Sequence, residues 1–296
     1  MSTIFSLQSH VVQGFVGNRI ASFVLQTLGH RVLQINTVQF SSHTGYTKWT
    51  GQVNQPEHIK DLVETSDEMG FLSQANAVIS GYLGDANLGH ELIAALKKIR
   101  QYHSNSLYFC DPVIGNARKS CYVRPEVVDF VRDYALTQAN IIKLNQFEAS
   151  TILQTNNAII PNQEKQSHQS NLEQAKELAK DLYQKMLDPK AVVISSVNMG
   201  DEIANLMFDG SNYFLIVTPL IKFSLQPNGC GDLLSSLFLG HYLNSNDLQQ
   251  AFSAGVNNIH SILQLTNELA DREICLVEGR KFIDRLDNQE FYLQKV

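Results

Sequence analysis

Short apolar runs of the β type recur along the 296-residue chain, and segments of helical length separate most of them. The segment 87–102, for example, carries Leu88, Leu92 and Leu96 at helical spacing, and 172–187 is a second such segment. Strands that alternate with helices predict an open, largely parallel sheet covered by helices on both faces. The predicted strands are 3–7, 31–40, 77–81, 107–113, 140–144, 191–195 and 213–217.

No linker or internal repeat divides the sequence, so we expect a single α/β domain over residues 1–296. The last helices, from about Asp232 to Leu265, are expected to cover one side of the sheet. The segment 154–171 is rich in Gln, Asn and Ser and shows no periodicity. It is predicted to be a mobile surface loop.

Charge and composition exclude several classes of protein. The net charge is −6 and no basic cluster is present, which argues against nucleic acid as the main partner. No apolar run approaches the roughly 20 residues that cross a membrane, and no basic region precedes the short apolar segment at the N-terminus. A cytoplasmic protein is expected. The cysteines form no Cys-x-x-Cys pair and are predicted to be free thiols: Cys110, Cys121, Cys230 and Cys275.

Ligands of open α/β sheets bind beyond the carboxyl ends of the strands, so the residues just after each predicted strand are the candidates. Asp111 and Glu148 are two such residues, and their carboxylates could hold the Mg²⁺ of a nucleotide complex. Alternatively, Asp111 opens a turn at Pro112 and Glu148 is an ordinary first-turn helix acid. The other polar candidates of this kind are Ser9, Thr44, Tyr82, Asn145, Ser195 and Ser196.

The stretch 228-NGCGDLLSSL-237 places two glycines and an acid at the start of an apolar helix. Gly229 and Gly231 would let several backbone N–H groups point into one space, which makes an anion site. Asp232 would repel that anion, unless it takes a proton from a group that attacks the anion. The alternative is an N-cap or first-turn aspartate, which would stabilise the helix by about 1 kcal/mol without doing chemistry. A P-loop and a Gly-x-Gly-x-x-Gly after the first strand are both absent, so neither a P-loop NTPase nor a dinucleotide enzyme fits.

With these motifs laid out, the sequence resembles the pyridoxal kinases of the ribokinase-like superfamily. The Gly-x-Gly-Asp element is common to that superfamily, whereas Q-S-H-V-V together with S-x-H-T-G-Y is specific to pyridoxal kinases. The matching stretches are 8-QSHVVQGFVGN-18, 37-TVQFSSHTGYTKWTGQV-53, 80-SGYLG-84, 110-CDPVIG-115, 145-NQFEA-149 and 229-GCGDLL-234.

The resemblance implies a ribokinase-like fold and transfer of the γ-phosphoryl group of ATP to the 5′-hydroxymethyl group of pyridoxal, for salvage of pyridoxal 5′-phosphate. It implies that Asp232 is the general base and that the amides of Gly229, Cys230 and Gly231 stabilise the transferring phosphoryl group. It further implies Mg²⁺ and a homodimer. The implied substrate-binding residues are Ser9, Val16, Thr44, Gly45, Tyr82 and Asp232. The implied ATP-binding residues are Asp111, Lys143, Asn145, Glu148, Ser195 and Ser196, with Asp111 and Glu148 near the metal.

Three positions depart from the family. Lys143-Leu144 stands where Thr-Pro or Ala-Pro is common, and Asn116 replaces a frequent aspartate; both positions lie near a monovalent cation in family members that have those residues. We hypothesise that the Lys143 ammonium supplies the charge of that cation, the alternative being that Lys143 points to solvent. Cys230 replaces Thr or Val. Packing explains it, although a helix N-terminus lowers thiol pKa and would make this thiol sensitive to oxidants.

Other functions are compatible with parts of the sequence. A hydroxymethylpyrimidine kinase is the nearest enzyme, but that branch typically has Cys at the position of Asp232. A sugar kinase would need a glycine-rich N-terminal motif that this sequence lacks. From a different class, a catalytically weak carrier of pyridoxal 5′-phosphate is compatible with Lys143 and Leu144. Retention of Asp232, Asp111 and Glu148 argues against it, because a carrier needs no phosphoryl-transfer groups.

Overall fold

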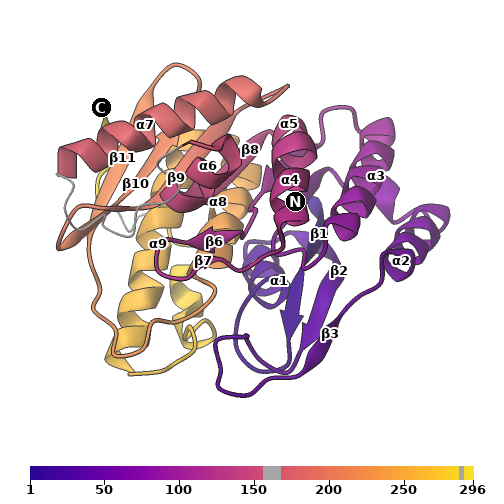
Figure 1. Cartoon of the computed structure of the whole chain (residues 1–296), viewed down its shortest axis with the longest axis horizontal. Helices are drawn as coiled ribbons and strands as arrows, with labels where there is room; N and C mark the ends of the chain where they lie inside the picture. The colour runs from indigo at the N-terminus through magenta and orange to yellow at the C-terminus, as the bar shows by residue number, and fades with distance from the viewer. Residues whose placement is uncertain (156–167, 287–289) are drawn as a thin grey trace.

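The computed structural model describes residues 1–155, 168–286 and 290–296, and its core is a single ten-stranded sheet (Figure 1). The strand order is β12-β11-β10-β9-β8-β5-β4-β1-β2-β3. Its strands are β1 Thr3–Val11, β2 Arg31–Phe40, β3 Gly51–Val53, β4 Ala77–Ser80, β5 Leu107–Cys110, β8 Ile141–Asn145, β9 Ala191–Asn198, β10 Glu202–Phe208, β11 Tyr213–Pro219 and β12 Gln294–Lys295. A separate short ribbon pairs β6 Gly115–Asn116 with β7 Ser120–Cys121.

The middle of the sheet is parallel and its edges are antiparallel. Strands β2, β1, β4, β5, β8 and β9 pair in parallel, whereas β3 closes one edge and β10 to β12 the other in antiparallel register. Strands β4 and β5 are buried along their whole length, as expected for parallel strands covered on both faces. The carboxyl ends of the parallel strands therefore gather at one edge of the sheet.

Helices cover both faces of this sheet. The helices are α1 Asn18–Thr27, α2 Pro56–Glu68, α3 Ala86–Tyr102, α4 Pro125–Phe130, α5 Leu136–Gln138, α6 Gln146–Leu153, α7 His168–Lys185, α8 Cys230–Ser245 and α9 Leu248–Glu268. A π-helical turn, Val131–Ala135, joins α4 to α5, and short 3-10 turns span Leu72–Gln74 and Glu278–Phe282.

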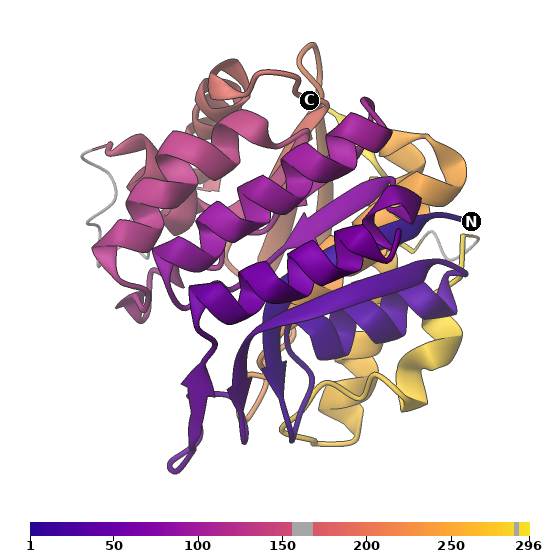
Figure 2. The same cartoon turned by 90° about the vertical axis from the view of Figure 1, so that its right-hand side faces the viewer.

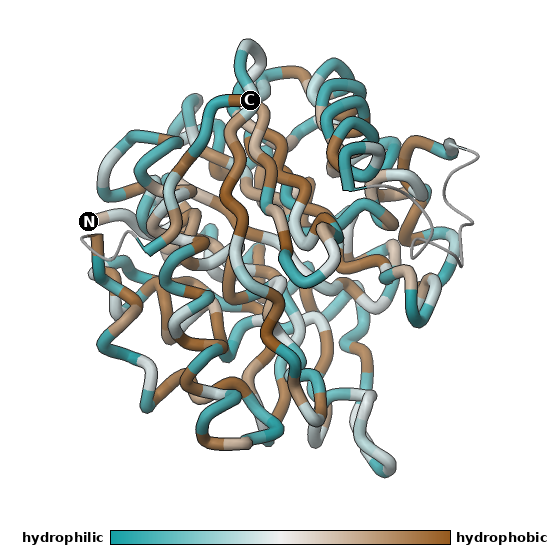
Figure 3. The backbone as a smooth tube through the Cα atoms, turned by 90° about the vertical axis from the view of Figure 1, so that its left-hand side faces the viewer, coloured by the Kyte–Doolittle hydropathy of each residue, from teal (hydrophilic) through white to brown (hydrophobic). Residues whose placement is uncertain are grey.

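Two apolar layers hold the helices to the sheet. Val78 and Ile142 belong to the layer under α2, α3, α6 and α7, while their chain neighbours Ile79 and Ile141 belong to the layer under α1, α8 and α9. This is the alternation of a strand buried on both faces. Figure 2 shows α2 and α3 side by side across one face, and Figure 3 shows brown strand segments in the middle of the molecule with teal turns on outer helices.

The seven predicted strands are all present, which confirms the predicted fold class. The sequence reasoning missed β10, an antiparallel strand that follows β9 after a turn of only a few residues, because it expected strands to be separated by helices. The helices α8 and α9 cover one side of the sheet, as predicted. No helix in the described ranges is long and apolar enough to cross a membrane.

The predicted loop at 154–171 is only partly described. Residues 156–167 lie outside the described part of the chain, but residues 168–171 form the first turn of α7 and not a loop. The prediction was wrong at this end because Asn171 is buried there: its side-chain amide donates to the carbonyl oxygen of Asn198. This bond to a distant segment holds the polar residues 168–171 in a helical turn, although their composition alone predicts a loop.

Candidate active site

The helix α8 begins in the glycine-rich stretch 228–231. Gly229 has φ 86°, and a Cβ atom there would lie 2.3 Å from the carbonyl oxygen of Phe15, so only glycine fits. Asp232 is in the first turn, and its Oδ2 accepts a hydrogen bond from the Gly17 N–H at 2.9 Å. Of the two positions in the alternative, Asp232 is therefore the first-turn acid and not the N-cap, and its carboxylate ties α8 to the loop before α1.

Burial and the charge of Asp111 raise the pKa of Asp232 to about 6, against the Gly17 hydrogen bond and the Lys143 charge, which lower it. The carboxylate is therefore ionised at neutral pH but is a stronger base than an exposed aspartate. A base of this kind beside a helix N-terminus can take a proton from an alcohol.

Lys143 and Asp111 form a buried ion pair. The Lys143 Nζ lies 2.8 Å from Asp111 Oδ2, and the two side chains are 5% and 2% exposed. Ser235 of α8 donates a second hydrogen bond to that oxygen, at 2.7 Å. A Cβ atom on Gly231 would lie 2.9 Å from the Lys143 Nζ. The alternative that Lys143 points to solvent is therefore wrong, and its ammonium lies against the glycine-rich start of α8.

The charge of Lys143 is balanced by three acids. Burial lowers the pKa of Lys143, but the charges of Asp111, Glu148 and Asp232 raise it, and the net pKa shift is upward. The lysine stays protonated at neutral pH. Because a buried ammonium without partners would lose its proton, this cluster fixes one positive charge beside Gly231 at the start of α8.

Glu148 holds two backbone segments together. Its Oε2 accepts from the N–H of Asn145 at 3.0 Å, the Asn145 side chain accepts from the Glu148 N–H, and this capping box begins α6. Its Oε1 accepts from the N–H groups of Ile114, at 2.8 Å, and Gly115, at 3.3 Å. The Asn145 amide also donates to the Gly115 carbonyl oxygen, at 2.8 Å. Glu148 is thus a first-turn acid of α6, as the alternative states, but its bonds to Ile114 and Gly115 go beyond the role of an ordinary one.

Burial raises the pKa of Glu148 to about 7, with Lys143 opposing the shift and Asp111 adding to it. The Asp111 carboxylate is therefore close enough to Glu148 for its negative charge to raise the pKa of Glu148. The loop that follows Asp111 is strained, because Val113 has φ 49°, which is unfavourable for a β-branched residue. Glu148 stabilises this strained loop by bonding its next two N–H groups.

The predicted alcohol-binding residues lie on both sides of Asp232. A Cβ atom on Gly17 would lie 2.4 Å from Ser9 Oγ, so Ser9 packs against the glycine that bonds Asp232. Val16 and Tyr82 share one small apolar cluster, which also contains Val38. Thr44 and Gly45 are exposed on the loop between β2 and β3. A Cβ atom on Gly45 would lie 3.8 Å from the Asn228 side chain, which places this loop beside the start of α8.

The remaining predicted nucleotide residues lie at the end of β8 and on β9. Ser195 pairs with Asn145 in the sheet register, and its hydroxyl donates to the Leu144 carbonyl oxygen at 3.2 Å. Ser196 is exposed with φ 57°, at an irregularity of the β9–β10 pairing, and its N–H donates to the Asn205 side chain. Bulges of this kind recur next to active sites, and this one exposes Ser196 near the carboxyl end of β9.

Cys230 differs from the expectation for its thiol. Burial and the charge of Asp232 raise the pKa of Cys230 to about 12, so the helix N-terminus does not activate it. The predicted sensitivity to oxidants therefore loses its basis, and packing remains the explanation.

We expect a Cys230→Thr variant to keep full activity, because the Cys230 thiol is protonated at neutral pH and donates to the Pro227 carbonyl oxygen, a bond that a threonine hydroxyl can also make. In the unmodified protein a disulfide reagent at pH 8 should label the exposed Cys121 before Cys230. Mass spectrometry of partly labelled protein checks the order. Early labelling of Cys230, or loss of activity in the threonine variant, would contradict this assignment.

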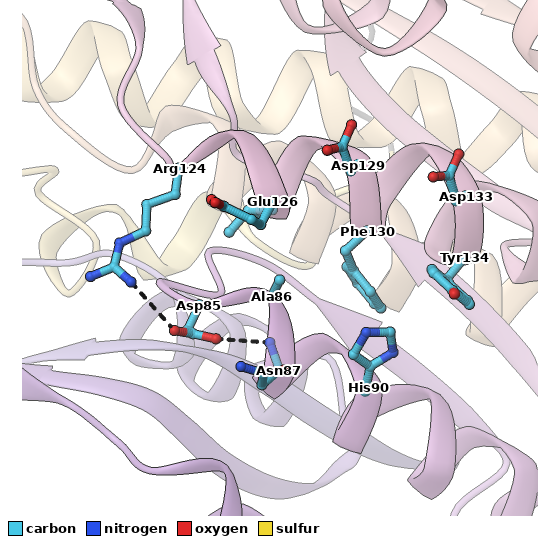
Figure 4. Close-up of a pocket in the computed structure, with 11 residues that line it drawn as sticks. Asp85, Ala86, Asn87, His90, Arg124, Glu126, Asp129, Phe130, Asp133 and Tyr134 are labelled. Carbon is cyan, nitrogen blue, oxygen red and sulfur yellow. Dashed lines mark hydrogen bonds and ion pairs between the residues drawn. The ribbon is translucent and has the colours of Figure 1, made fainter.

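A pocket of about 530 Å³ also lies between the start of α3 and α4 (Figure 4). None of its lining residues was predicted to belong to the site. Arg124 and Asp85 pair across it at 3.7 Å, with side chains 74% and 30% exposed, so solvent screens the pair. Phe130 and Tyr134 flank His90 in this pocket. It contains no base beside an anion site and is distinct from the cluster around Asp232.

Several residues of the site escaped the sequence reasoning. Gly17 is one, although a glycine directly before a helix offers a weak signal for a free N–H. Ser235 is another; it lies one turn after Asp232 on α8 and bonds Asp111. The residues Arg272 and Glu273, which contact the loops around the alcohol side, carry no sequence signal, because only the return of the chain after α9 brings them there.

The fold and the site together define a small-molecule kinase of the ribokinase-like α/β class. A family model described as phosphomethylpyrimidine kinase matches residues 37–274. Relatives that match nearly the whole chain indicate a narrower family. It is 34% identical over 284 residues to the pyridoxal kinase PdxY of Granulibacter bethesdensis, with 94% of each chain covered. It is 36% identical over 287 residues to that of Histophilus somni strain 2336, with 96% of each covered.

A solved structure agrees with these relatives. The pyridoxal kinase of Leishmania donovani in complex with ADP and pyridoxine superposes with a TM-score of 0.86 at 25% identity, over 99% of both chains. This chain therefore belongs to the pyridoxal kinase family.

Proposed function

We propose that this protein is a pyridoxal kinase, which transfers the γ-phosphoryl group of ATP to the 5′-hydroxymethyl group of pyridoxal. The observation that carries the proposal is the position of Asp232, a base with a raised pKa in the first turn of α8, directly after the glycine-rich anion site. A binding protein would gain nothing from a base at this point. Membership of the pyridoxal kinase family supports the choice of alcohol.

In the proposed reaction Asp232 accepts the proton of the alcohol as the oxygen attacks the γ-phosphorus. The Gly17 N–H fixes Oδ2 of the carboxylate, which leaves Oδ1 for the proton. The backbone N–H groups of Gly229, Cys230 and Gly231 face the anion with the positive end of the α8 dipole and stabilise charge on the transferring phosphoryl group. The Lys143 ammonium adds a full positive charge behind Gly231.

Two residues fit a magnesium ion. Asp111 Oδ1 is buried and accepts no hydrogen bond from the described residues, so it is available as a ligand or as an acceptor for a metal-bound water. Both oxygens of Glu148 already accept backbone bonds, which suits a contact through water. The described residues contain no group of three or more His, Cys, Asp or Glu that would hold a metal alone, and Mg²⁺ usually takes phosphate oxygens and waters besides one or two carboxylates. Bound there, Mg²⁺ would neutralise phosphate charge.

The remaining predicted residues divide between the two substrates. Ser9 and Thr44 offer hydroxyl groups to the polar substituents of the pyridoxal ring, while Val16 and Tyr82 offer apolar surface to its faces, with Gly45 allowing the loop to approach. Asn145, Ser195 and Ser196 are proposed to contact ATP from β8 and β9. A homodimer in the cytoplasm remains a prediction.

The test is formation of pyridoxal 5′-phosphate from pyridoxal, ATP and Mg²⁺, followed by absorbance, with hydroxymethylpyrimidine as the competing alcohol. Turnover with kcat/KM at least tenfold higher for pyridoxal supports the proposal. Preference for hydroxymethylpyrimidine would place the chain with the other branch covered by the family model. Binding of pyridoxal without any product would establish the carrier function instead.

The pH profile tests the base separately. Because the pKa of Asp232 is raised to about 6, we expect kcat/KM for pyridoxal to be level above that pH and to fall about tenfold per unit below it, as the base takes up a proton. Initial rates between pH 5 and 8.5 measure the limb, with ATP binding at each pH as the control. An activity that stays constant down to pH 5 would exclude Asp232 as the base.

A further inference from the structure

Arg272 and Glu273 lie after the end of α9, far along the chain from every other residue of the site. Glu273 is 8% exposed, and both of its carboxylate oxygens are engaged. Oε1 accepts a hydrogen bond from the Tyr46 hydroxyl, and Oε2 accepts from the Phe15 N–H at 3.3 Å. Tyr46 and Glu273 are 227 positions apart. A single carboxylate therefore joins the loop 12–17, which precedes α1, to the loop 41–50, which connects β2 with β3.

The space for this carboxylate is made by a glycine. Gly14 has φ +94°, and a Cβ atom there would lie 2.3 Å from Glu273 Oε2. Asp271 Oδ1 in turn accepts from the Glu273 N–H at 3.0 Å and orients the residue. The loop 12–17 is therefore shaped around Glu273, and the contact is not an incidental approach of two surfaces.

Arg272 makes a parallel set of contacts with the loop 41–50. Its guanidinium carbon lies 3.5 Å from the centroid of the Tyr46 ring, and Nη2 donates to the Gly45 carbonyl oxygen at 3.2 Å. Burial and the hydrogen bond to Glu273 raise the pKa of Tyr46 to about 12, so its hydroxyl remains a donor at every working pH. In contrast, the bonds that Gly45 and Tyr46 make to His43 are local to the loop.

Both loops lead directly to the reacting groups. Phe15, which bonds Glu273, is two residues before Gly17, whose N–H holds Asp232. Gly45, which bonds Arg272, lies beside Asn228, the residue before the glycine-rich start of α8. A movement of either loop would therefore change the space between the base and the loop 41–50, where the alcohol is proposed to bind.

We infer that Arg272 and Glu273 form a clamp that fixes the loops 12–17 and 41–50 against each other and thereby sets the affinity of the site for its alcohol substrate. Both are positioning residues: they act through Tyr46, Gly45 and Phe15 and touch neither substrate. The inference rests on the proposed function, because it specifies how that site holds its alcohol. In the described residues no hydrogen bond joins Arg272 or Glu273 to the nucleotide segments on β8, β9 and α6. Phe15 also packs against Gly229, so the affinity for the nucleotide should respond less than the affinity for the alcohol.

The decisive variant is Tyr46→Phe, which removes one hydroxyl and keeps the ring under Arg272. Isothermal titration gives Kd for pyridoxal and for a non-hydrolysable ATP analogue, and steady-state rates give KM and kcat. We expect Kd and KM for pyridoxal to rise about tenfold, as for the loss of one hydrogen bond to a charged group, and the nucleotide Kd to rise less. A rise of less than twofold, or equal losses for both ligands, would overturn the clamp.

A double-mutant cycle shows whether the effect passes through Glu273. Tyr46→Phe should weaken pyridoxal binding in the parent protein but should have no further effect in a Glu273→Gln background if the two groups act through their shared bond. Equal effects in both backgrounds would overturn the proposed connection. Glu278→Gln is the matched control, since Glu278 is an exposed acid of the same segment.

Hydrogen exchange separates failure of the clamp from failure of the proposed function. If the unmodified protein binds no pyridoxal, the proposed function fails, and the amide exchange of the two loops tests the clamp alone. Faster exchange in both 12–17 and 41–50 in Glu273→Gln, with Glu278→Gln unchanged, supports the clamp. Exchange that stays the same in both loops would contradict it.

Discussion

Replacing Asp232 with asparagine should reduce turnover of pyridoxal by about 10²- to 10⁴-fold, the usual contribution of a general base. Asparagine keeps an oxygen that can accept the Gly17 N–H bond but cannot take a proton. The Kd for pyridoxal should therefore remain close to that of the unmodified protein. Single-turnover rates and ligand titration on the same preparations measure both quantities. Turnover within tenfold of the parent would show that another group removes the proton.

The same variant should be more stable than the parent at pH 8. The pKa of Asp232 is raised from 3.8 to about 6 in the folded state. The carboxyl group therefore contributes its full share to the stability of the fold below pH 3.8, and this contribution is lost as pH rises through 6. The neutral amide avoids that loss. We expect a gain of about 1–2 kcal/mol at pH 8, after allowance for the partial exposure of the side chain, and little gain below pH 4. Urea unfolding at the two pH values tests the sign, and lower stability at pH 8 would contradict it.

Replacing Lys143 with methionine should have the second large effect, on both stability and rate. The ammonium is 5% exposed and pairs with Asp111 at 2.8 Å, so its removal leaves a buried carboxylate without its partner. Breaking such a pair costs about 3–5 kcal/mol. Turnover should fall as well, because the positive charge behind Gly231 is lost. Urea unfolding and steady-state rates measure the two effects.

Two further variants separate the causes. Adding Asp111→Asn to Lys143→Met removes the unpaired charge and should restore much of the stability without restoring activity. Lys222→Met is the matched control, since Lys222 pairs with Asp201 at 3.1 Å but both side chains are mostly exposed, at 77% and 90%. Equal losses in Lys222→Met and Lys143→Met would show that burial of the pair has no special effect.

The ammonium of Lys143 should also make the protein independent of added K⁺. The three acids around it need a nearby positive charge, and the chain supplies one. Rates in potassium and in tetramethylammonium salts of equal ionic strength should therefore agree for the parent protein. A strong activation by K⁺ would refute the hypothesis that Lys143 takes the place of the monovalent cation.

The sequence by itself determined the fold class and the glycine-rich start of α8. Apolar runs such as 77–81 and 107–113 appear as the buried parallel strands β4 and β5, because two covered faces require nearly continuous apolar residues. The glycine-rich start of α8 was visible in the sequence, because a backbone with φ 86° at Gly229 requires glycine wherever it occurs. These features are local, so a local pattern records them.

Only the tertiary structure decided the features that join distant segments. The strand β10 is antiparallel and adjoins β9 without a helix, an arrangement that the alternating pattern does not contain. Whether Lys143 pointed to solvent or into the site was open in the sequence, and its buried ion pair with Asp111, beside α8, settled it. The clamp of Arg272 and Glu273 depends on contacts across 227 positions. No short-range pattern predicts such contacts, because their free energy is gained only when the whole chain has folded and the separate segments meet.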